Sequence, residues 1–477
     1  LSMIHADIEY IYCPESHDLA LGSNVGFAHT TGQNVVFVEQ GCQVEPEWLE
    51  PLLASLKSGV GIAAPMQLAP NRTITSAGIL LPSIAKRMMP LRFLQHHPVE
   101  DTRLLDASYS VSAVSDGCIA VRATDFAKLQ GFNPLFDNGF ETPDLCMRAN
   151  KMKLGKIVVA KNCSIVNVYK DRGWSNKNYS TFISRWGNTP TANSDDLWKK
   201  AGFRVSKYIT EEARIGLPGK IRPLLERVDR TKIRWAIKTS SPADDTRFEW
   251  GDKYFAESIA KSLEKLGHEA IVDNRSSHDR PTAYLDDVLL SLRGLVQFTP
   301  QPDKLNFMWV ISHPEMVTEL EIKSFDKVYA AGTRWARDMT KSVGEPIDTL
   351  LQCVDNSYFQ PPKKPNKEFQ NKVLFVGNSR NVYRQVVKDG LKAGLDVAIY
   401  GSRWEQFVDE KYIKKQLIPN SVLPEAYGSA KVVLNDHWDD MRHWGFLSNR
   451  LFDATATGAC IVSDRIEGAS EIFGKLL

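Results

Sequence analysis

The amino-acid sequence predicts an α/β fold with parallel sheets, arranged in three successive blocks. Short apolar runs rich in β-branched residues alternate with helical patterns, which is typical of strand–helix–strand units with helices on both faces of a sheet. The length of 477 residues corresponds to about three domains. Hydrophobic residues make up 43% of the chain and charged residues 24%, which is typical of a folded globular protein and argues against a mostly disordered one.

In the first two blocks, apolar runs predict strands that are followed by helices. Residues 34–38 form such a run, and Pro46 stands at an early position of the helix that follows. A strand at residues 233–237 precedes a helix over about residues 251–266, which Gly267 ends. This helix has four apolar residues on its core-facing side: Phe255, Ile259, Leu263 and Leu266.

The third block shows the same alternation of strands and helices. Two segments, called joints here, separate the three blocks. Strands at residues 373–376 and 397–400 flank a turn at Gly377 and a helix. A basic joint with ten Lys and Arg against four Asp and Glu is predicted to form linker helices, and a proline-rich joint cannot continue a helix or a central strand. The expected domains are therefore residues 1–198, 199–232 (the basic joint), 233–360 and 361–477.

Charge, apolar runs and cysteines exclude several classes of protein. The 59 Lys and Arg against 57 Asp and Glu leave a net charge of +2, which is too small for nucleic-acid binding through bulk charge. No apolar run is long enough to span a bilayer, and no signal peptide is recognised at the start, so a cytoplasmic location is expected. The 7 cysteines are dispersed without a CxxC pair, which favours thiols in a reducing compartment over a disulfide or zinc scaffold.

A turn in the third block is a candidate phosphate site. Gly377, Ser379 and Arg380 follow a strand, and Arg384 lies roughly one helical turn further on. Backbone N–H groups at such a turn and guanidinium groups beside it bind phosphate oxygens. The alternative is a tight turn with two solvated arginines.

A helix start further along the same block is a second candidate anion site. Ser448, Asn449 and Arg450 open a helix that ends near Gly458, and helix N-termini bind diphosphates. Asp453 lies one turn into this helix, where its carboxylate is placed to accept hydrogen bonds from ribose hydroxyls. The alternative is an ordinary capped helix.

Together these motifs resemble the nucleotide-binding half of GT-B glycosyltransferases of group 1, also called family 4, including spore-protein CgeB-like members. The resemblance extends over the segments 375–380, 427–435 and 448–453. It implies a nucleotide-diphosphate sugar donor, with UDP, dTDP or GDP as the nucleotide, and no metal requirement. One acidic member of the usual Glu-x7-Glu pair falls on Gly445, so this sequence departs from the family there.

The second block resembles the acceptor-side half of the same enzymes, through segments 249–256, 292–294 and 309–314. The resemblance implies a cleft that His313 faces, where its side chain either orients a sugar and exchanges protons or packs beside Pro314. Asp252 and Arg293 are further candidate catalytic residues.

The first block resembles a different class, the GT-A glycosyltransferases of family 2. The matching segments are 22–26, 34–49, 116–118, 130–133, 140–148 and 186–187. The family's first strand is expected upstream of Leu1, so this copy is expected to be incomplete.

Three departures from the family 2 pattern predict a degenerate GT-A site. The turn that holds the metal reads Glu39-Gln40-Gly41, with Gly41 at the position of the metal-binding Asp. The pair that contains the catalytic base reads Glu141-Thr142, and the late metal-assisting His is Asn167. Because a hard cation needs oxygen ligands and a general base needs a titratable group, we expect no metal-dependent transfer here.

A competing interpretation of the first block keeps it active. Glu39, Asp116 and Asp144 would then replace the lost ligands and base, and Mg²⁺ or Mn²⁺ would be required.

The whole chain is thus expected to be a hexosyltransferase-type glycosyltransferase in bacterial surface polysaccharide synthesis. Its GT-B module would transfer a sugar from a nucleotide-diphosphate sugar to a glycan or lipid-linked oligosaccharide acceptor. The basic joint either contacts the inner membrane face or a lipid-diphosphate acceptor, or is a solvated linker. Two other functions stay open, a bifunctional polymerase with both modules active and a non-catalytic glycan-binding scaffold.

Overall fold

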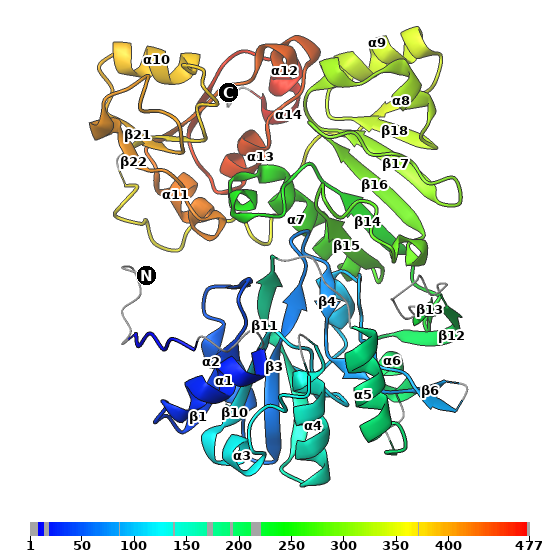
Figure 1. Cartoon of the computed structure of the whole chain (residues 1–477). Helices are drawn as coiled ribbons and strands as arrows, with labels where there is room; N and C mark the ends of the chain where they lie inside the picture. Colours follow the sequence, from blue (N-terminus) through cyan, green and yellow to red (C-terminus); the bar gives the residue numbers. More distant parts are fainter. Residues whose placement is uncertain are drawn as a thin grey trace. The chain divides into compact units, whose positions relative to one another are not determined.

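The computed structural model describes residues 8–13, 19–84, 86–136, 139–168, 175–190, 194–210, 221–370 and 372–474. The chain forms two compact units, which can be followed in Figure 1. The N-terminal unit contains residues 1–231 and 279–285, and the C-terminal unit contains residues 232–278 and 286–477. In the described residues, no helix combines the length and the apolar character needed to cross a membrane.

The N-terminal unit is built around a mixed sheet. Its strands, in order across the sheet, are β1 (Asn34–Val38), β10 (Cys118–Arg122), β3 (Val60–Leu68), β11 (Lys156–Asn167) and β2 (Cys42–Val44), with β4 (Ile74–Ser76) on β3 and β9 (Ser108–Ser110) on β11. Only the β3–β11 pair is parallel. All nine residues of β3 are buried, because the strand lies in the middle of the sheet between two apolar clusters.

Helices and short ladders complete the N-terminal unit. They are α1 (Leu19–Ala28), α2 (Leu49–Ser55), η1 (Val99–Thr102), α3 (Ala123–Lys128), α4 (Glu141–Lys151), α5 (Asn176–Trp186), α6 (Asp195–Lys200), η3 (Ala283–Leu285), and the ladders of β5 (Ile79–Leu80) with β8 (Leu91–Arg92) and β6 (Ser83–Ile84) with β7 (Arg87–Met88). The domain predicted from the sequence over residues 233–360 included residues 279–285. The structure corrects this boundary, because Leu285 joins the core of the N-terminal unit and the Tyr284 hydroxyl accepts a hydrogen bond from Leu225 N at 3.0 Å.

The basic joint forms a β-hairpin after the end of α6. The prediction of linker helices over residues 199–232 is therefore wrong for the residues that follow α6. Strands β12 (Phe203–Thr210) and β13 (Ile221–Arg227) pair antiparallel. Phe203 and Leu225 are buried in the unit's core. Apolar residues alternate with polar ones here, which is the strand period, and the charge count alone did not reveal it. Residues 211–220 lie outside the described part of the chain.

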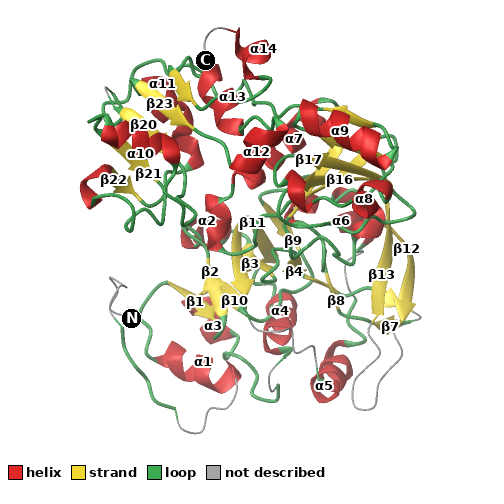
Figure 2. Ribbon diagram, turned by 90° about the horizontal axis from the view of Figure 1, so that it is seen from above, coloured by secondary structure: helices red, strands yellow, loops and turns green. Residues whose placement is uncertain are grey.

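The C-terminal unit contains two parallel sheets, as the sequence predicts (Figure 2). The first has the order β15 (Glu269–Asp273), β14 (Arg234–Lys238), β16 (Val288–Arg293), β17 (Leu305–Val310), β18 (Lys327–Ala330) and β19 (Ile347–Thr349). The second has the order β22 (Ile413–Lys415), β21 (Val397–Tyr400), β20 (Val373–Val376), β23 (Val432–Asn435) and β24 (Ile461–Ser463). All of their strand pairs are parallel, which places the carboxyl ends of the strands at one edge of each sheet.

Helices connect the strands of both sheets. They are η2 (Asp245–Glu249), α7 (Gly251–Lys265), η4 (Pro314–Met316), α8 (Glu319–Lys323), α9 (Thr333–Val343), α10 (Gln385–Lys392), η5 (Glu410–Tyr412), η6 (Asn420–Val422), α11 (Leu423–Ser429), α12 (Asp439–Trp444), α13 (Asn449–Ala456) and α14 (Ala469–Phe473). On α7, Phe255, Ile259 and Leu263 face the core as predicted. Leu266 does not, because the helix ends at Lys265 and leaves this side chain 75% exposed.

One segment crosses from the second sheet to the core of the first. Met441 and Phe446, in and just after α12, pack in the same apolar cluster as Trp335 of α9. Phe446 also forms a backbone bridge with Gly332, next to α9. By sequence α12 follows β23 of the second sheet, but its packing attaches it to the first sheet.

Candidate functional site

The turn at Gly377 lies where β20 ends. Gly377 has φ 153°, and a Cβ atom there would lie 2.9 Å from Nη2 of Arg450. Only glycine therefore fits at this position without displacing the arginine. Arg450 Nη2 donates to the Val376 carbonyl at 2.6 Å, so the arginine side chain from α13 covers the end of β20.

Three arginines gather at this turn. Arg384 pairs with Asp436 through Nε and Oδ2 at 2.9 Å, and Arg450 Nη1 donates to Asn435 Oδ1 at 2.9 Å. Among the described residues, neither Arg380 nor Arg450 forms an ion pair with a carboxylate. Burial and the two neighbouring guanidinium groups lower the pKa of Arg380. The cluster therefore has more positive charge than the carboxylates that pair with it.

Trp438 provides an aromatic surface under two of these arginines. The guanidinium carbon of Arg384 lies 4.6 Å from the Trp438 ring centre, and that of Arg380 lies 5.6 Å from it. These cation–π contacts hold the two guanidinium groups near each other despite their like charge.

A closed ring of hydrogen bonds fixes the start of α13. His437 Nδ1 lies 2.6 Å from Asp464 Oδ1, and its Nε2 accepts the Ser448 N–H at 3.1 Å. The ring closes in three further bonds: Ser448 Oγ to Asn435 Oδ1 at 2.9 Å, Asn435 Nδ2 to Ser463 Oγ at 2.9 Å and Ser463 Oγ to Asp464 Oδ1 at 3.2 Å. Because Nε2 of His437 accepts a hydrogen bond, the ring proton lies on Nδ1, which donates a hydrogen bond to Asp464.

Asn435, His437 and Asp464 of this ring were not among the site residues predicted from the sequence. Burial raises the pKa of Asp464, but its hydrogen bonds from His437 outweigh this effect and leave the pKa lowered. The polar residues directly after β23 and β24 were the available signal, because the carboxyl ends of neighbouring parallel strands meet at one edge.

Two further residues of α13 have unusual polar groups. Asn449 Oδ1 is buried and has no hydrogen-bond partner among the described residues. Burial raises the pKa of Asp453 to about 7, against the opposing effect of Arg450. Both side chains line the smaller cavity.

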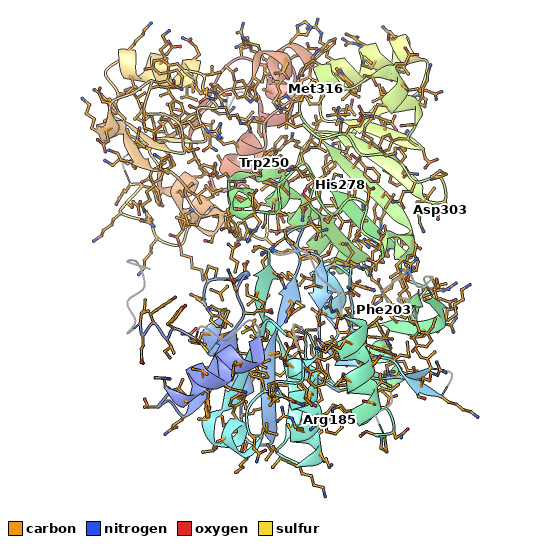
Figure 3. The ribbon with its side chains drawn as sticks, viewed as in Figure 1. Arg185, Phe203, Trp250, His278, Asp303 and Met316 are labelled. Carbon is orange, nitrogen blue, oxygen red and sulfur yellow. The ribbon has the colours of Figure 1, made fainter. Side chains whose placement is uncertain are left out.

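Two cavities adjoin at this turn. The larger, of about 840 Å³, is lined by residues that follow strands of both sheets. The smaller, of about 460 Å³, has more aromatic and aliphatic residues and includes Asp453. Both are lined by Trp250, Gly377, Asn378, Arg380, Asn449 and Arg450. Trp250, labelled in Figure 3, lies at the start of α7. The predicted anion-binding turn and helix start thus lie on the boundary between the two cavities.

Two of the predicted catalytic residues line the larger cavity. Asp252 Oδ2 accepts the Ser240 N–H at 3.0 Å, and burial raises the pKa of Asp252. His313 adopts a left-handed conformation with φ 54°, and its Nδ1 lies 3.3 Å from Glu315 Oε1. The structure therefore brings Asp252 and His313 into one cavity with the arginine cluster.

Two predicted site residues have structural roles instead. Arg293 Nε donates to Glu321 Oε1 at 2.6 Å, and its side chain is 3% exposed and lines neither cavity. Ser379 is fully buried, donates to the Arg403 carbonyl and accepts the Asn381 N–H at 3.2 Å. Local partners thus use the Arg293 guanidinium and the Ser379 hydroxyl, while a catalytic Arg293 and a donor-binding Ser379 stay predictions.

Three of the predicted GT-A positions, Glu39, Gly41 and Asn167, lie near one another in the N-terminal unit. Glu39 N donates to the Gly117 carbonyl at 2.7 Å, and the Gly41 carbonyl accepts the Val168 N–H at 2.9 Å. Asn167 pairs with Cys42 between β11 and β2. The turn after β1 therefore lies beside the end of β11, as a metal site there would require.

The acidic residues near this turn are used by the fold. The Asp116 carboxylate accepts N–H groups of Phe140 at 3.3 Å and Thr142 at 2.9 Å, at the start of α4. Glu141 is fully buried, and its Oε2 accepts the Gly139 N–H at 2.6 Å. Thr142 is 2% exposed.

Asp144 is a buried structural carboxylate. It pairs with Arg148 at 2.8 Å, lies 3.3 Å from Nε of Arg185, labelled in Figure 3, and accepts the indole N–H of Trp186 at 2.9 Å. With 0% of its side chain exposed, it cannot act as a ligand at an open site without losing these partners.

Two segments of the chain match family models. A model described as glycosyl transferase-like matches residues 380–475, and the model of glycosyl transferase family 2 matches residues 3–105. These matches bear out both resemblances and support the expected class of a transferase: a segment like glycosyl transferase family 2 precedes a second, glycosyl transferase-like segment.

Comparison with solved structures and curated proteins adds little. A crystal structure of GalNAc-T7 with UDP, GalNAc and Mn²⁺ is similar at 18% identity and a TM-score of 0.29, over 38% of this chain and 40% of that chain. The chain thus matches less than half the length of that protein. No curated protein matches it.

Proposed function

We propose that the C-terminal unit transfers a sugar from a nucleotide-diphosphate sugar to a glycan or lipid-linked acceptor. The observation that supports this most strongly is the pair Arg380 and Arg450, which line both cavities without a carboxylate partner among the described residues. Unpaired guanidinium groups beside a glycine turn and a helix start favour a diphosphate.

The donor is proposed to lie across the boundary of the two cavities. Its diphosphate contacts Arg380, Arg450 and the start of α13, and its nucleoside occupies the smaller cavity. There the Asp453 carboxylate accepts hydrogen bonds from the ribose hydroxyls, and Asn449 Oδ1 gains a donor. The sugar enters the larger cavity, which Asp252 and His313 line.

Transfer follows from this placement. The acceptor hydroxyl oxygen bonds to the anomeric carbon, the bond from that carbon to the diphosphate oxygen breaks, and the leaving diphosphate takes the electron pair. Arg380 and Arg450 stabilise the charge that develops on it, so the diphosphate needs no cation. The hydroxyl proton passes to the carboxylate of Asp252, whose pKa is raised by burial, and His313 orients the acceptor.

The N-terminal unit is proposed to keep the family 2 fold without metal-dependent transfer. The carboxylates offered as substitutes, Asp116 and Asp144, serve the start of α4 and a buried ion pair. Glu39 alone offers too few oxygen ligands for a hard cation. We propose that this one active module acts in the cytoplasm, in bacterial surface polysaccharide synthesis.

The test is a thermal-shift series on the full chain with UDP, dTDP, GDP and their sugars, in EDTA. One of the three nucleotides is expected to raise the melting temperature, because a ligand that binds only the folded state stabilises it. Arg380→Ala is expected to remove this rise, and the matched control Arg337→Ala, an exposed arginine on α9, is expected to keep it. A rise that needs Mg²⁺ or Mn²⁺, or no rise with any nucleotide, contradicts the proposal; the latter favours a non-catalytic scaffold.

A further inference from the structure

Three side chains that could ligate a metal meet at the edge of the larger cavity. His313 and Glu315 lie in and beside η4, and Asp440 lies in the first turn of α12. Each contributes one nitrogen or oxygen atom, and these atoms lie within 4.8 Å of one another. Met316, labelled in Figure 3, ends η4 and marks this place in the fold.

Carboxylate oxygens of Glu315 and Asp440 lie within 4.8 Å of each other. Asp440 Oδ2 is buried and has no hydrogen-bond partner among the described residues. In the same part of the chain, no Lys or Arg forms an ion pair with Asp440 or Glu315; the one basic side chain within 4 Å of either carboxylate is His313, whose Nδ1 lies 3.3 Å from Glu315 Oε1. Because adjacent carboxylates repel, this arrangement requires a shared proton or a cation between them.

Nearby basic residues are engaged elsewhere. Arg384 pairs with Asp436, and Arg442, in the last turn of α12, pairs with Asp439 and lies 3.7 Å from Asp464. Neither provides the missing positive charge to Asp440.

We propose that His313, Glu315 and Asp440 bind a divalent transition-metal cation such as Zn²⁺. One imidazole and two carboxylates form the mixed nitrogen and oxygen set that such cations prefer, whereas Mg²⁺ and Ca²⁺ favour oxygen ligands alone. All three residues also line the larger cavity.

The bound cation links α12 to η4, because Asp440 lies in α12 and Glu315 lies in η4. These two elements are in contact, and α12 also packs on α9, so the metal strengthens the attachment of this crossing segment to the first sheet. Trp438 directly precedes α12, and Arg380 and Arg384 stack on its ring. The metal thus steadies the aromatic surface beneath the arginines without touching the diphosphate, and its binding does not depend on the donor.

The test is metal binding by the full chain after removal of metals with EDTA. Zn²⁺ is titrated by calorimetry and Co²⁺ by visible absorption, with no nucleotide present. We expect one cation per chain, a Co²⁺ spectrum without thiolate charge transfer, and no binding of Mg²⁺. His313→Ala and Asp440→Asn are expected to weaken binding at least about tenfold.

The controls separate a specific site from adventitious binding and from misfolding. Glu319→Gln alters an exposed carboxylate on α8 that pairs with Lys323, and it is expected to bind the cation like the unaltered chain. Asp440→Asn keeps the side-chain shape, and its melting temperature without metal is expected to match that of the unaltered chain. Equal affinity of the unaltered chain and Asp440→Asn, a cysteine-type Co²⁺ spectrum, or no binding overturns the proposal.

Discussion

The two units place their charged groups in opposite ways. At the Gly377 turn, Arg380 and Arg450 have no carboxylate partner among the described residues. At the turn after β1, by contrast, the neighbouring Asp116 and Asp144 are bound by backbone N–H groups, Arg148 and Trp186. Charge without a carboxylate partner is what the proposed donor site uses, whereas charge with several buried partners stabilises the fold.

The largest expected effect tests this difference between the two units at the Gly377 turn. Arg380→Ala removes a cation from the proposed leaving-group site, and we expect kcat/KM for sugar transfer to fall about 100-fold, in the range seen when one transition-state donor is removed. Glu141→Gln in the N-terminal unit is expected to leave the same rate unchanged. Steady-state kinetics with the donor found in the thermal-shift series measures both.

The outcome for Glu141→Gln also decides between one active module and two. Loss of a second, distinct linkage in its product, while Asp453→Asn loses the first, would show a bifunctional polymerase and contradict the proposed loss of transfer in the N-terminal unit.

A second prediction concerns stability. Asp144→Ala leaves Arg148 and the Trp186 indole without their buried partner, and we expect the free energy of unfolding of the N-terminal unit to fall by about 3 kcal/mol. Urea unfolding followed by tryptophan fluorescence measures it. Asp196→Ala, an exposed aspartate on α6, is the matched control and is expected to change little. An equally small effect of Asp144→Ala would show that this carboxylate is free for another role.

The smallest expected effect sharpens the role of Asp453. Its pKa is raised to about 7, and the ionised carboxylate is the better acceptor for ribose hydroxyls, so donor affinity is expected to rise between pH 6 and pH 8. Asp453→Asn is expected to flatten this profile, measured by calorimetry with the bound nucleotide.

The same group gives stability the opposite pH dependence. A carboxyl group with a raised pKa in the folded state holds its proton more tightly there than when unfolded, so its contribution is present at low pH and is lost as pH rises toward 7. For the pH dependence of donor affinity described above, the contradicting result is an Asp453→Asn profile that matches the profile of the unaltered chain. Another group would then control binding.

Much of the fold was predictable because its signals are local. The parallel strands of the C-terminal unit, the turn at Gly377 and the helix that begins after Ser448 all follow from apolar runs and capping residues close in the sequence. The hairpin of β12 and β13 was predictable in the same way, but its positive charge suggested helices instead of the alternation around Phe203.

The partners of the charged residues were not predictable, because they come from distant parts of the chain. Arg293 pairs with Glu321 from the following helix, and Arg384 pairs with Asp436, which lies after another strand. The ring of Asn435, His437 and Asp464 around Ser448 likewise joins three separate loops.

The sequence by itself therefore determined the succession of strands and helices and the positions of the turn and the helix start that we propose to bind an anion, since these depend on residues within a few positions of one another. The tertiary structure alone decided which charges remain unpaired, that α12 packs on the first sheet, and that His313, Glu315 and Asp440 meet. The physical reason is that pairing and burial of charge depend on distances through space, which a chain of this length does not encode in any local pattern.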